Sequence, residues 1–209
     1  MKTSKIRKLI SRTLDEDKRS RNAENILQND LQQRGLTFNQ NQLNELVEFL
    51  RAYVENVPLL LEKLFDAAKK KGIANQVSPM LNTVEEYFLE PNDFIPDYLG
   101  LIGLIDDAYL AQKLVQVLSD NYRQQTGIPL LNVDLSEGNN IIRNLIGEPI
   151  AGMLDASVMN TVQMPSMQQF FQNLMNFQGM MPMSTPHPIY GNMSNSEIAD
   201  VRLGAMGVI

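Results

Sequence analysis

The stretch that decides the fold runs from Glu90 to Asp107 and reads EPNDFIPDYLGLIGLIDD. Its first half holds Pro91 and Pro96, which prevent a regular helix because proline lacks a backbone donor and clashes with the preceding turn. Its second half is rich in large aliphatic residues, and aspartates stand at positions 93, 97, 106 and 107. We therefore expect a proline-set turn between two helices.

Each half of this stretch has an expected structural role. The carboxylates of Asp93 and Asp97 can bond backbone amides at the turn and at the start of the next helical segment. Gly100 and Gly103 lie three residues apart, which predicts that they share one helix face and let another helix approach closely. The pair Asp106-Asp107 follows about one turn later, and we expect it on an exposed or partner-facing side.

Three hypotheses explain the four aspartates. The first is structural, with the carboxylates as caps, turn acceptors and salt-bridge partners of Arg51, Lys63 or Lys113. The second is an acidic surface that faces a partner. The third is a divalent cation site, because hard cations prefer several carboxylate oxygens and clustered aspartates repel one another without a cation. The candidate metal ligands are Asp93, Asp97, Asp106 and Asp107.

This order of residues resembles the bacterial YkvA-type domain, a small helical family without an assigned biochemical function. The family's hallmark is a D-x-I-P-D segment, an apolar glycine-containing stretch, and then L-D-D. The corresponding elements are Asp93-Phe94-Ile95-Pro96-Asp97, Tyr98 to Leu104, and Ile105-Asp106-Asp107. A helix ending in YFLEP before the segment and the run AYLAQKLVQVL after it fit the same layout, so the resemblance spans roughly residues 57–120.

The departures from the family pattern are mild. Leu99-Gly100 occupies the region where the family often has a second proline, and Ile105 replaces the usual leucine. The resemblance implies a compact helical hairpin or a small bundle. It implies no activity, because the family itself has none that is agreed.

Apolar spacing in the rest of the chain is helical, so the expected fold class is all-α. We expect a small helical bundle with an N-terminal helical extension and a Met-rich C-terminal region of short helices and an extended tail. The expected segments are an N-terminal basic and amphipathic helix, a YkvA-like core, a Met-rich region of short helices, and a tail with a short terminal helix. Their boundaries are 1–35, 36–127, 128–177 and 178–209.

Capping and proline signals set the expected helix limits. The spacing predicts one helix over residues 5–33, and a second that Asn39 caps and Pro58 ends or kinks. Ser78-Pro79 predicts a further helix start, because serine caps helices and proline suits the first helical position. A long helix is expected from about Ile102 to Arg123.

Composition excludes several classes of protein. The chain has 209 residues, no cysteine and a single histidine, so disulfides, thiolate metal sites and multi-histidine sites are ruled out. A net charge of −6 disfavours nucleic acid as a partner of the whole chain. Aromatic residues are only 7%, which leaves little for a substrate cleft, and we expect no enzyme and no cofactor beyond a divalent cation.

The N-terminal twelve residues differ in charge from the rest of the chain. They carry five cations and no acid, which leaves −11 on the remainder. Beside apolar residues at helical spacing, these cations form a short basic amphipathic helix that could bind a partner or a membrane surface. The candidate binding residues are Lys5, Arg7, Lys8 and Arg12. A transmembrane span is not expected, because charged residues interrupt the apolar run from Phe94 to Leu118.

Methionine is concentrated in the last third of the chain. Residues 153–183 hold eight methionines, and methionine fills adaptable interfaces because it is flexible and polarizable. The candidate interface residues are Met164, Met167, Phe170, Phe171 and Met175.

The sequence leads to one main hypothesis about function and two alternatives. The main hypothesis is a non-enzymatic interaction or assembly protein of the bacterial cytoplasm, which contacts a protein partner or copies of itself. The first alternative is a divalent-metal-binding protein, or a metal-dependent enzyme, that uses the aspartates. The second is a protein held peripherally at the inner membrane by its N-terminal helix.

Overall fold

The apolar stripes of the sequence form helices that pack against one another, and the protein is all-α. The computed structural model describes residues 3–33, 39–90, 94–163 and 187–188. The helices are α1 (Ser4–Ser20), α2 (Asn22–Gln33), α3 (Gln40–Glu55), α4 (Val57–Lys70), α5 (Ala74–Tyr87), α6 (Ile105–Thr126), α7 (Ser136–Ile146) and α8 (Ile150–Val162), with 3-10 turns η1 (Asp97–Leu99) and η2 (Ile102–Leu104).

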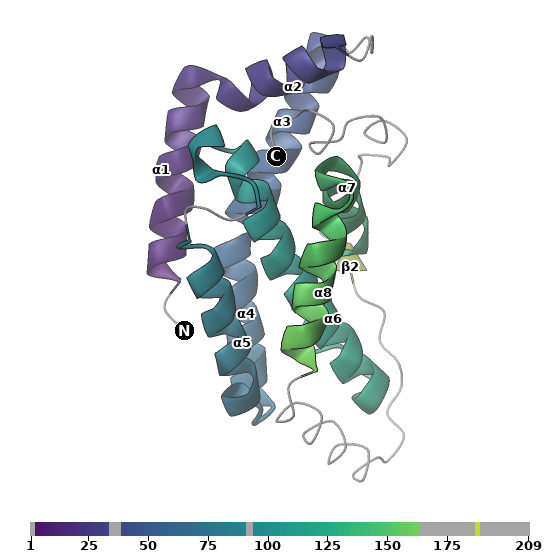
Figure 1. The fold of residues 1–209 in the computed structure, drawn as a ribbon. Helices are drawn as coiled ribbons and strands as arrows, with labels where there is room; N and C mark the ends of the chain where they lie inside the picture. The colour runs from purple at the N-terminus through teal and green to yellow at the C-terminus, as the bar shows by residue number, and fades with distance from the viewer. Residues whose placement is uncertain (1–2, 34–38, 91–93, 164–186, 189–209) are drawn as a thin grey trace.

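Helix α6 is the centre of the bundle. It packs against α3, α4, α5, α7 and α8, while α1 lies along one side of the molecule and α8 along the other (Figure 1). One apolar core runs from Ile6 in α1 to Val162 in α8, and its largest fully buried side chains include Tyr53, Tyr109 and Phe88. The described parts of the first three expected segments therefore share a core, although no observation tests the boundaries between them.

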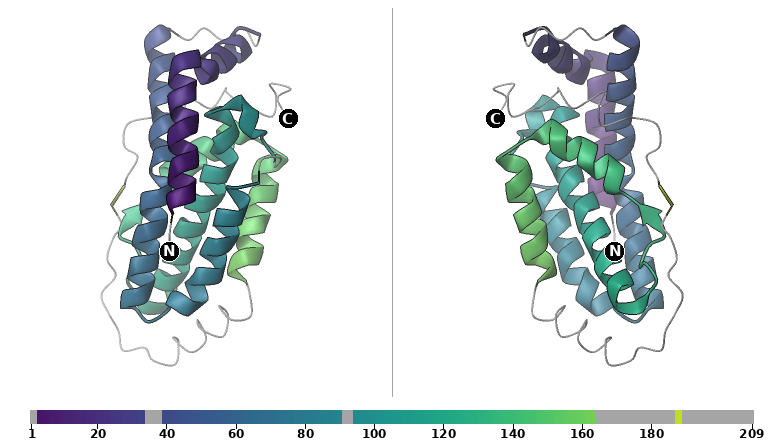
Figure 2. Two further views of the ribbon diagram at one scale, coloured as in Figure 1. Left: turned by 90° about the vertical axis from the view of Figure 1, so that its left-hand side faces the viewer. Right: turned by 90° about the vertical axis from the view of Figure 1, so that its right-hand side faces the viewer.

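The N-terminal region contains two helices, so the expectation of one helix over residues 5–33 is wrong. Arg21 has a φ of 54°, and this left-handed backbone ends α1. Helix α2 then turns away across the end of the bundle (Figure 2). The sequence gives no warning of this corner, because the left-handed position is occupied by arginine and not by glycine.

Helices α3 and α4 follow the expected signals. The Asn39 side chain accepts from the Gln42 amide, and the Gln42 side chain accepts from the Asn39 amide, which forms a capping box at the start of α3. Pro58 lies in the first turn of α4, where its missing donor costs nothing. Of the two expected effects of Pro58, an end or a kink, the structure has the end, because α3 stops at Glu55 and α4 starts at Val57.

The expected start at Ser78-Pro79 is wrong. Helix α5 begins at Ala74, and Pro79 lies inside it. The proline removes one amide donor near the start of the helix, and the buried residues Val77, Met80 and Leu81 on its inner face hold the helix together. Packing here overrides a local signal.

Beyond α6 the chain adds α7, α8 and one short strand pair. Strand β1 (Val133–Asp134) pairs in parallel with β2 (His187–Pro188). A buried polar ladder fastens α7 to the bundle, since the Tyr53 hydroxyl donates to Asn139 Oδ1 at 2.6 Å. Asn139 Nδ2 in turn donates to Gln116 Oε1 at 2.6 Å. The expected terminal helix lies outside the described residues.

Candidate functional site

The turn between α5 and α6 is built around a buried carboxylate. Asp106 is 0% exposed, and its Oδ2 accepts from the backbone amide of Ile95 at 3.1 Å. Ile95 is also fully buried, so this bond satisfies a donor that water cannot reach. Asp106 therefore closes the proline-set turn from the far side of the apolar run.

The Asp106-Asp107 pair does not face solvent or a partner, as the sequence suggested. Both side chains are 0% exposed. They lie in the first turn of α6, where the helix dipole favours negative charge, and α6 is surrounded by other helices. The expectation was wrong because it placed the pair by its spacing from Gly103 and took no account of α6 as the central helix.

Gly103 is needed for a close approach within the turn itself. A Cβ at this position would lie 2.5 Å from the Pro96 carbonyl oxygen and 2.9 Å from the Asp97 Cα. Gly100 has a φ of 71° and ends η1, so the two glycines do not form one face of a regular helix. Gly103 lets the chain fold back on itself. At Gly100 side chains of other helices do approach, since Asp17 Oδ1 and Asn22 Nδ2 lie 3.6 and 3.7 Å from its Cβ position, so the expected approach is found at Gly100 and not at Gly103.

Asp97 is the half-buried acid of the turn. Burial raises the pKa of the Asp97 carboxyl, and the nearby Arg12 guanidinium partly offsets this by favouring the charged form. Within the described ranges no donor reaches Asp97 Oδ1. Its charged form is therefore poorly compensated at neutral pH.

The structure describes three of the four candidate metal ligands. Asp93 lies outside the described residues, whereas Asp97, Asp106 and Asp107 lie within them. Among the residues that the structure describes, no group of three or more acidic or histidine side chains could hold a metal ion. The hypothesis stays a prediction, which thermal unfolding with EDTA and then with Mg²⁺, Ca²⁺ or Mn²⁺ would test.

The corner between α1 and α2 packs directly on this turn. Asn22 Nδ2 donates to the Leu99 carbonyl at 3.0 Å, and Asp17 Oδ1 accepts from the Ala23 amide at 2.9 Å. Arg51 on α3 pairs with Asp17 Oδ2 at 3.3 Å, with Asp17 fully buried. Sequence reasoning missed this corner: it offered Arg51 as a partner of the turn aspartates and did not single out Asp17.

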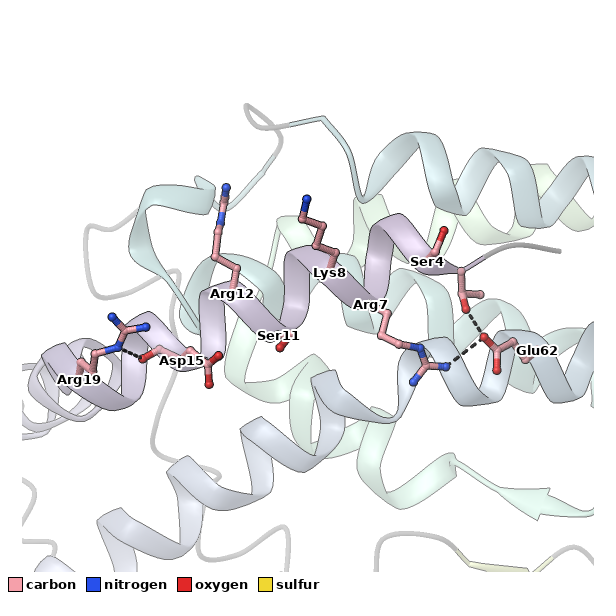
Figure 3. A pocket seen from close by; sticks show the side chains of 9 residues that line it. Ser4, Arg7, Lys8, Ser11, Arg12, Asp15, Arg19 and Glu62 are labelled. Atoms are coloured by element: carbon pink, nitrogen blue, oxygen red, sulfur yellow. Dashed lines mark hydrogen bonds and ion pairs between the residues drawn. The ribbon is translucent and has the colours of Figure 1, made fainter.

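The outer side of α1 carries the cations that the sequence identified. A hollow of about 740 Å³ runs along this helix, and Figure 3 shows the side chains that line it. The lining consists of four cations, two acids and three hydroxyls: Arg7, Lys8, Arg12, Arg19, Asp15, Glu62, Thr3, Ser4 and Ser11. We call this hollow the α1 groove.

One wall of the α1 groove is fixed by Glu62 on α4. Arg7 Nη2 donates to Glu62 Oε1 at 3.0 Å, and the Thr3 hydroxyl donates to the same oxygen. The Thr3 hydroxyl, and less strongly Arg7, hold the pKa of the Glu62 carboxyl below its ordinary value. Lys5 lies outside the groove, with its Nζ 3.8 Å from Glu85 Oε1.

A second polar cluster lies between α6, α7 and α8. The Tyr109 hydroxyl donates to Asp155 Oδ1 at 2.7 Å, and Arg143 Nε donates to Asp155 Oδ2 at 2.8 Å. Lys113 Nζ lies 3.9 Å from Asp155 Oδ1, and Arg143 also pairs with Glu148. Burial, and then Asp155, raise the pKa of Tyr109. The cluster clamps α8 to the bundle, and it includes Lys113, which the sequence analysis offered as one of three partners for the turn aspartates.

Comparison with known proteins bears on the turn. Residues 87–111 match the family model described as "Protein of unknown function (DUF1232)". We call residues 87–111 the DUF1232 segment, after the model that they match. The match confirms the resemblance to a YkvA-like helical domain of unknown function, and the DUF1232 segment contains Gly103 and the buried Asp106-Asp107 pair. No curated protein and no solved structure matches the chain.

Two further sequence expectations concern the Met-rich region, which is not tested, and a membrane span. The candidate interface residues Met164, Met167, Phe170, Phe171 and Met175 all lie outside the described residues. In the part of the chain that the structure describes, no helix is long and apolar enough to cross a bilayer.

Proposed function

We propose that the protein is a non-enzymatic interaction protein of the bacterial cytoplasm and that the outer side of α1 binds its partner. The observation that supports this is that the inner face of α1 is packed against the core. Ile6, Ile10 and Leu14 are 0–3% exposed against the core, so the helix is held in place and its cations point outward. Binding groups on a docked helix lose little freedom when a partner arrives.

The charge of α1 sets it apart from the rest of the surface. Its six cations and three acids give a formal charge of +3, which leaves −9 on the rest of a chain whose total is −6. A basic ridge on an acidic body attracts acidic partners and orients them, because only one side of the molecule is favourable.

The DUF1232 segment supports a role in folding more than one in catalysis. Asp106 accepts a backbone hydrogen bond, and both carboxylates of the Asp106-Asp107 pair are fully buried. A general acid or base must come within hydrogen-bond reach of a substrate. The segment thus builds the platform on which the corner between α1 and α2 rests, through the Asn22 contact to Leu99 at the start of α2.

Affinity purification from the source organism tests the proposal. The full-length protein is compared with Lys8→Glu/Arg12→Glu on α1 and with Lys70→Glu/Lys71→Glu at the exposed end of α4, which changes the net charge equally. We expect the wild type and the α4 variant to retain the same partner and the α1 variant to lose it. Retention of the same partner by all three proteins would show that α1 is not the binding surface.

Self-association is the other half of the main hypothesis. It depends on the Met-rich region, residues 128–177, whose candidate interface residues lie beyond the end of α8. Light scattering of the full-length protein over a range of concentrations tests it, and a monomer at the highest concentration would exclude it.

A further inference from the structure

The α1 groove has the dimensions of a site for a polypeptide segment. Its volume of about 740 Å³ lies within the range of ligand sites, and a smaller hollow of about 280 Å³ adjoins it and shares Arg7, Ser11 and Asp15. The two hollows follow the helix axis, as the line of side chains in Figure 3 shows for the larger one. An elongated ligand fits this shape better than a compact one.

Three cations of the groove are weakly engaged by the protein itself. Arg12 Nε lies 4.0 Å from Glu16 Oε1, at the limit of an ion pair, and the Arg19 Nε donates to the Asp15 carbonyl at 3.1 Å. Among the described residues no ion pair holds Lys8, whose side chain is exposed. Arg7 differs from these three because it forms an ion pair with Glu62.

The spacing of these cations matches an extended chain. Lys8 and Arg12 are four residues apart on α1, which is a rise of about 6 Å. Side chains on one face of an extended segment repeat about every 6.6 Å, at every second residue. The step from Arg12 to Arg19 is about 10 Å, or about three extended residues. Because three is an odd number, a carboxylate three residues further on would point to the opposite face of the extended segment. The pattern E-x-E therefore meets Lys8 and Arg12, and Arg19 lies outside this register and adds positive charge only.

The acids of the groove separate a peptide from other anions. Asp15 lies between Arg12 and Arg19 along the helix, and Glu62 closes the other side. A lipid surface or a nucleic acid presents negative charge continuously and is repelled by these carboxylates, whereas a peptide can place a neutral or basic residue opposite each of them. The apolar side of α1 is buried in the core and is not available for insertion into a bilayer.

We propose that the α1 groove binds an extended acidic segment of a partner protein, with carboxylates spaced as E-x-E on Lys8 and Arg12 and with Arg19 adding to the attraction. This inference rests on the proposed function and names the class of partner. The mixed charge of the groove lining sets the register, and the exposed cations supply the attraction.

Fluorescence anisotropy with defined peptides tests it on the full-length protein. The probe is a labelled peptide with two glutamates spaced E-S-E-S, and the comparison peptide has the same residues in the order E-S-S-E, which puts the two carboxylates on opposite faces of an extended chain. We expect saturable binding of the spaced peptide, weaker binding of the comparison peptide, and a loss of at least about tenfold in Lys8→Glu/Arg12→Glu. Lys70→Glu/Lys71→Glu is expected to bind as the wild type does.

Several outcomes would overturn the inference. Equal binding of the two peptides would show that the spacing of the carboxylates does not matter. Unchanged binding by the α1 variant would show that the peptide does not bind in the α1 groove. If the wild type binds vesicles of phosphatidylglycerol and does not bind the spaced peptide, α1 binds a lipid surface and the inference is wrong. If the peptide fails while partner capture still depends on Lys8 and Arg12, the inference is wrong and the proposed function stands. Lys8→Ala/Arg12→Ala, which avoids new acids on the helix, checks that lost binding is not misfolding.

Discussion

Gly103 is the residue at which the turn has least room. The Pro96 carbonyl oxygen lies 2.5 Å from the place where a Cβ would stand, and it belongs to the backbone, so it cannot swing aside. The adjacent Asp106 bond to Ile95 holds the same loop against α6. The turn is thus pinned at two points, one of which requires the absence of a side chain.

Replacing this glycine should destabilise the protein. We expect Gly103→Ala to lower the free energy of unfolding by about 1–3 kcal/mol, the usual cost of forcing an extra methyl group into a filled space. Urea denaturation measures it. Gly152→Ala is the matched control, because its Cβ would meet only the flexible end of Glu148 and alanine favours the helix. Equal losses in both variants would contradict the role of the Pro96 contact.

Asp97 supplies a prediction about pH. Because its folded pKa is raised, the folded state favours the protonated form, so Asp97 contributes stability at low pH and loses it as pH rises through the folded pKa. Asp97→Asn removes this dependence and should be more stable than the wild type at neutral pH. The advantage should shrink as pH falls toward the ordinary value of 3.8. Denaturation of both proteins at a series of pH values checks this, and a difference that does not vary with pH would contradict it.

At the scale of elements, the sequence predicts helices well where caps and packing agree. Asn39 and the apolar stripe of α3 both indicate a helix from Gln40, and the structure has one. At Pro79 the two disagree, and packing of Val77 and Met80 determines the outcome. Arg21 carries no local signal at all, because its left-handed φ of 54° is a conformation that glycine adopts far more readily than arginine.

The candidate sites show the same division. The cations of α1 could be identified from sequence because charge is a property of composition. The burial of the Asp106-Asp107 pair could not, because it depends on the neighbours of α6. Asp17 was missed for a similar reason, since its partner Arg51 lies 34 residues away and nothing local distinguishes it from Asp15 or Glu16.

Asp17 should control the docking of α1 and α2. Asp17→Ala would leave the Ala23 amide without its acceptor and Arg51 without its buried partner, although Glu48 still pairs with Arg51. We expect a loss of about 3 kcal/mol, with faster amide exchange in α1 and α2 than elsewhere. Asp15→Ala, on the exposed side of the same helix, should cost about 0.5 kcal/mol or less. Uniform loss of protection across all helices would contradict a local role.

For the whole molecule, the distribution of charge suggests two separate parts, whereas the distribution of buried apolar side chains indicates one. The charge divides the chain into a basic helix and an acidic body. The apolar core does not divide it, because Ile6 near the first turn and Leu154 in α8 belong to one continuous set of buried side chains. A partner that binds α1 therefore contacts a part of the core fold and not a loose arm.

This continuity predicts one cooperative unfolding transition for the described fold. Ile6→Ala and Leu154→Ala each remove a fully buried side chain and should lower the free energy of unfolding by about 2–5 kcal/mol. Both should shift the same midpoint, whether unfolding is followed by circular dichroism or by tyrosine fluorescence. Leu59→Ala, at a side chain 43% exposed, should change the midpoint little. If Ile6→Ala instead produced an early separate transition while the main midpoint stayed in place, α1 would be an independent unit. The rigid presentation of Lys8 and Arg12 would then be lost.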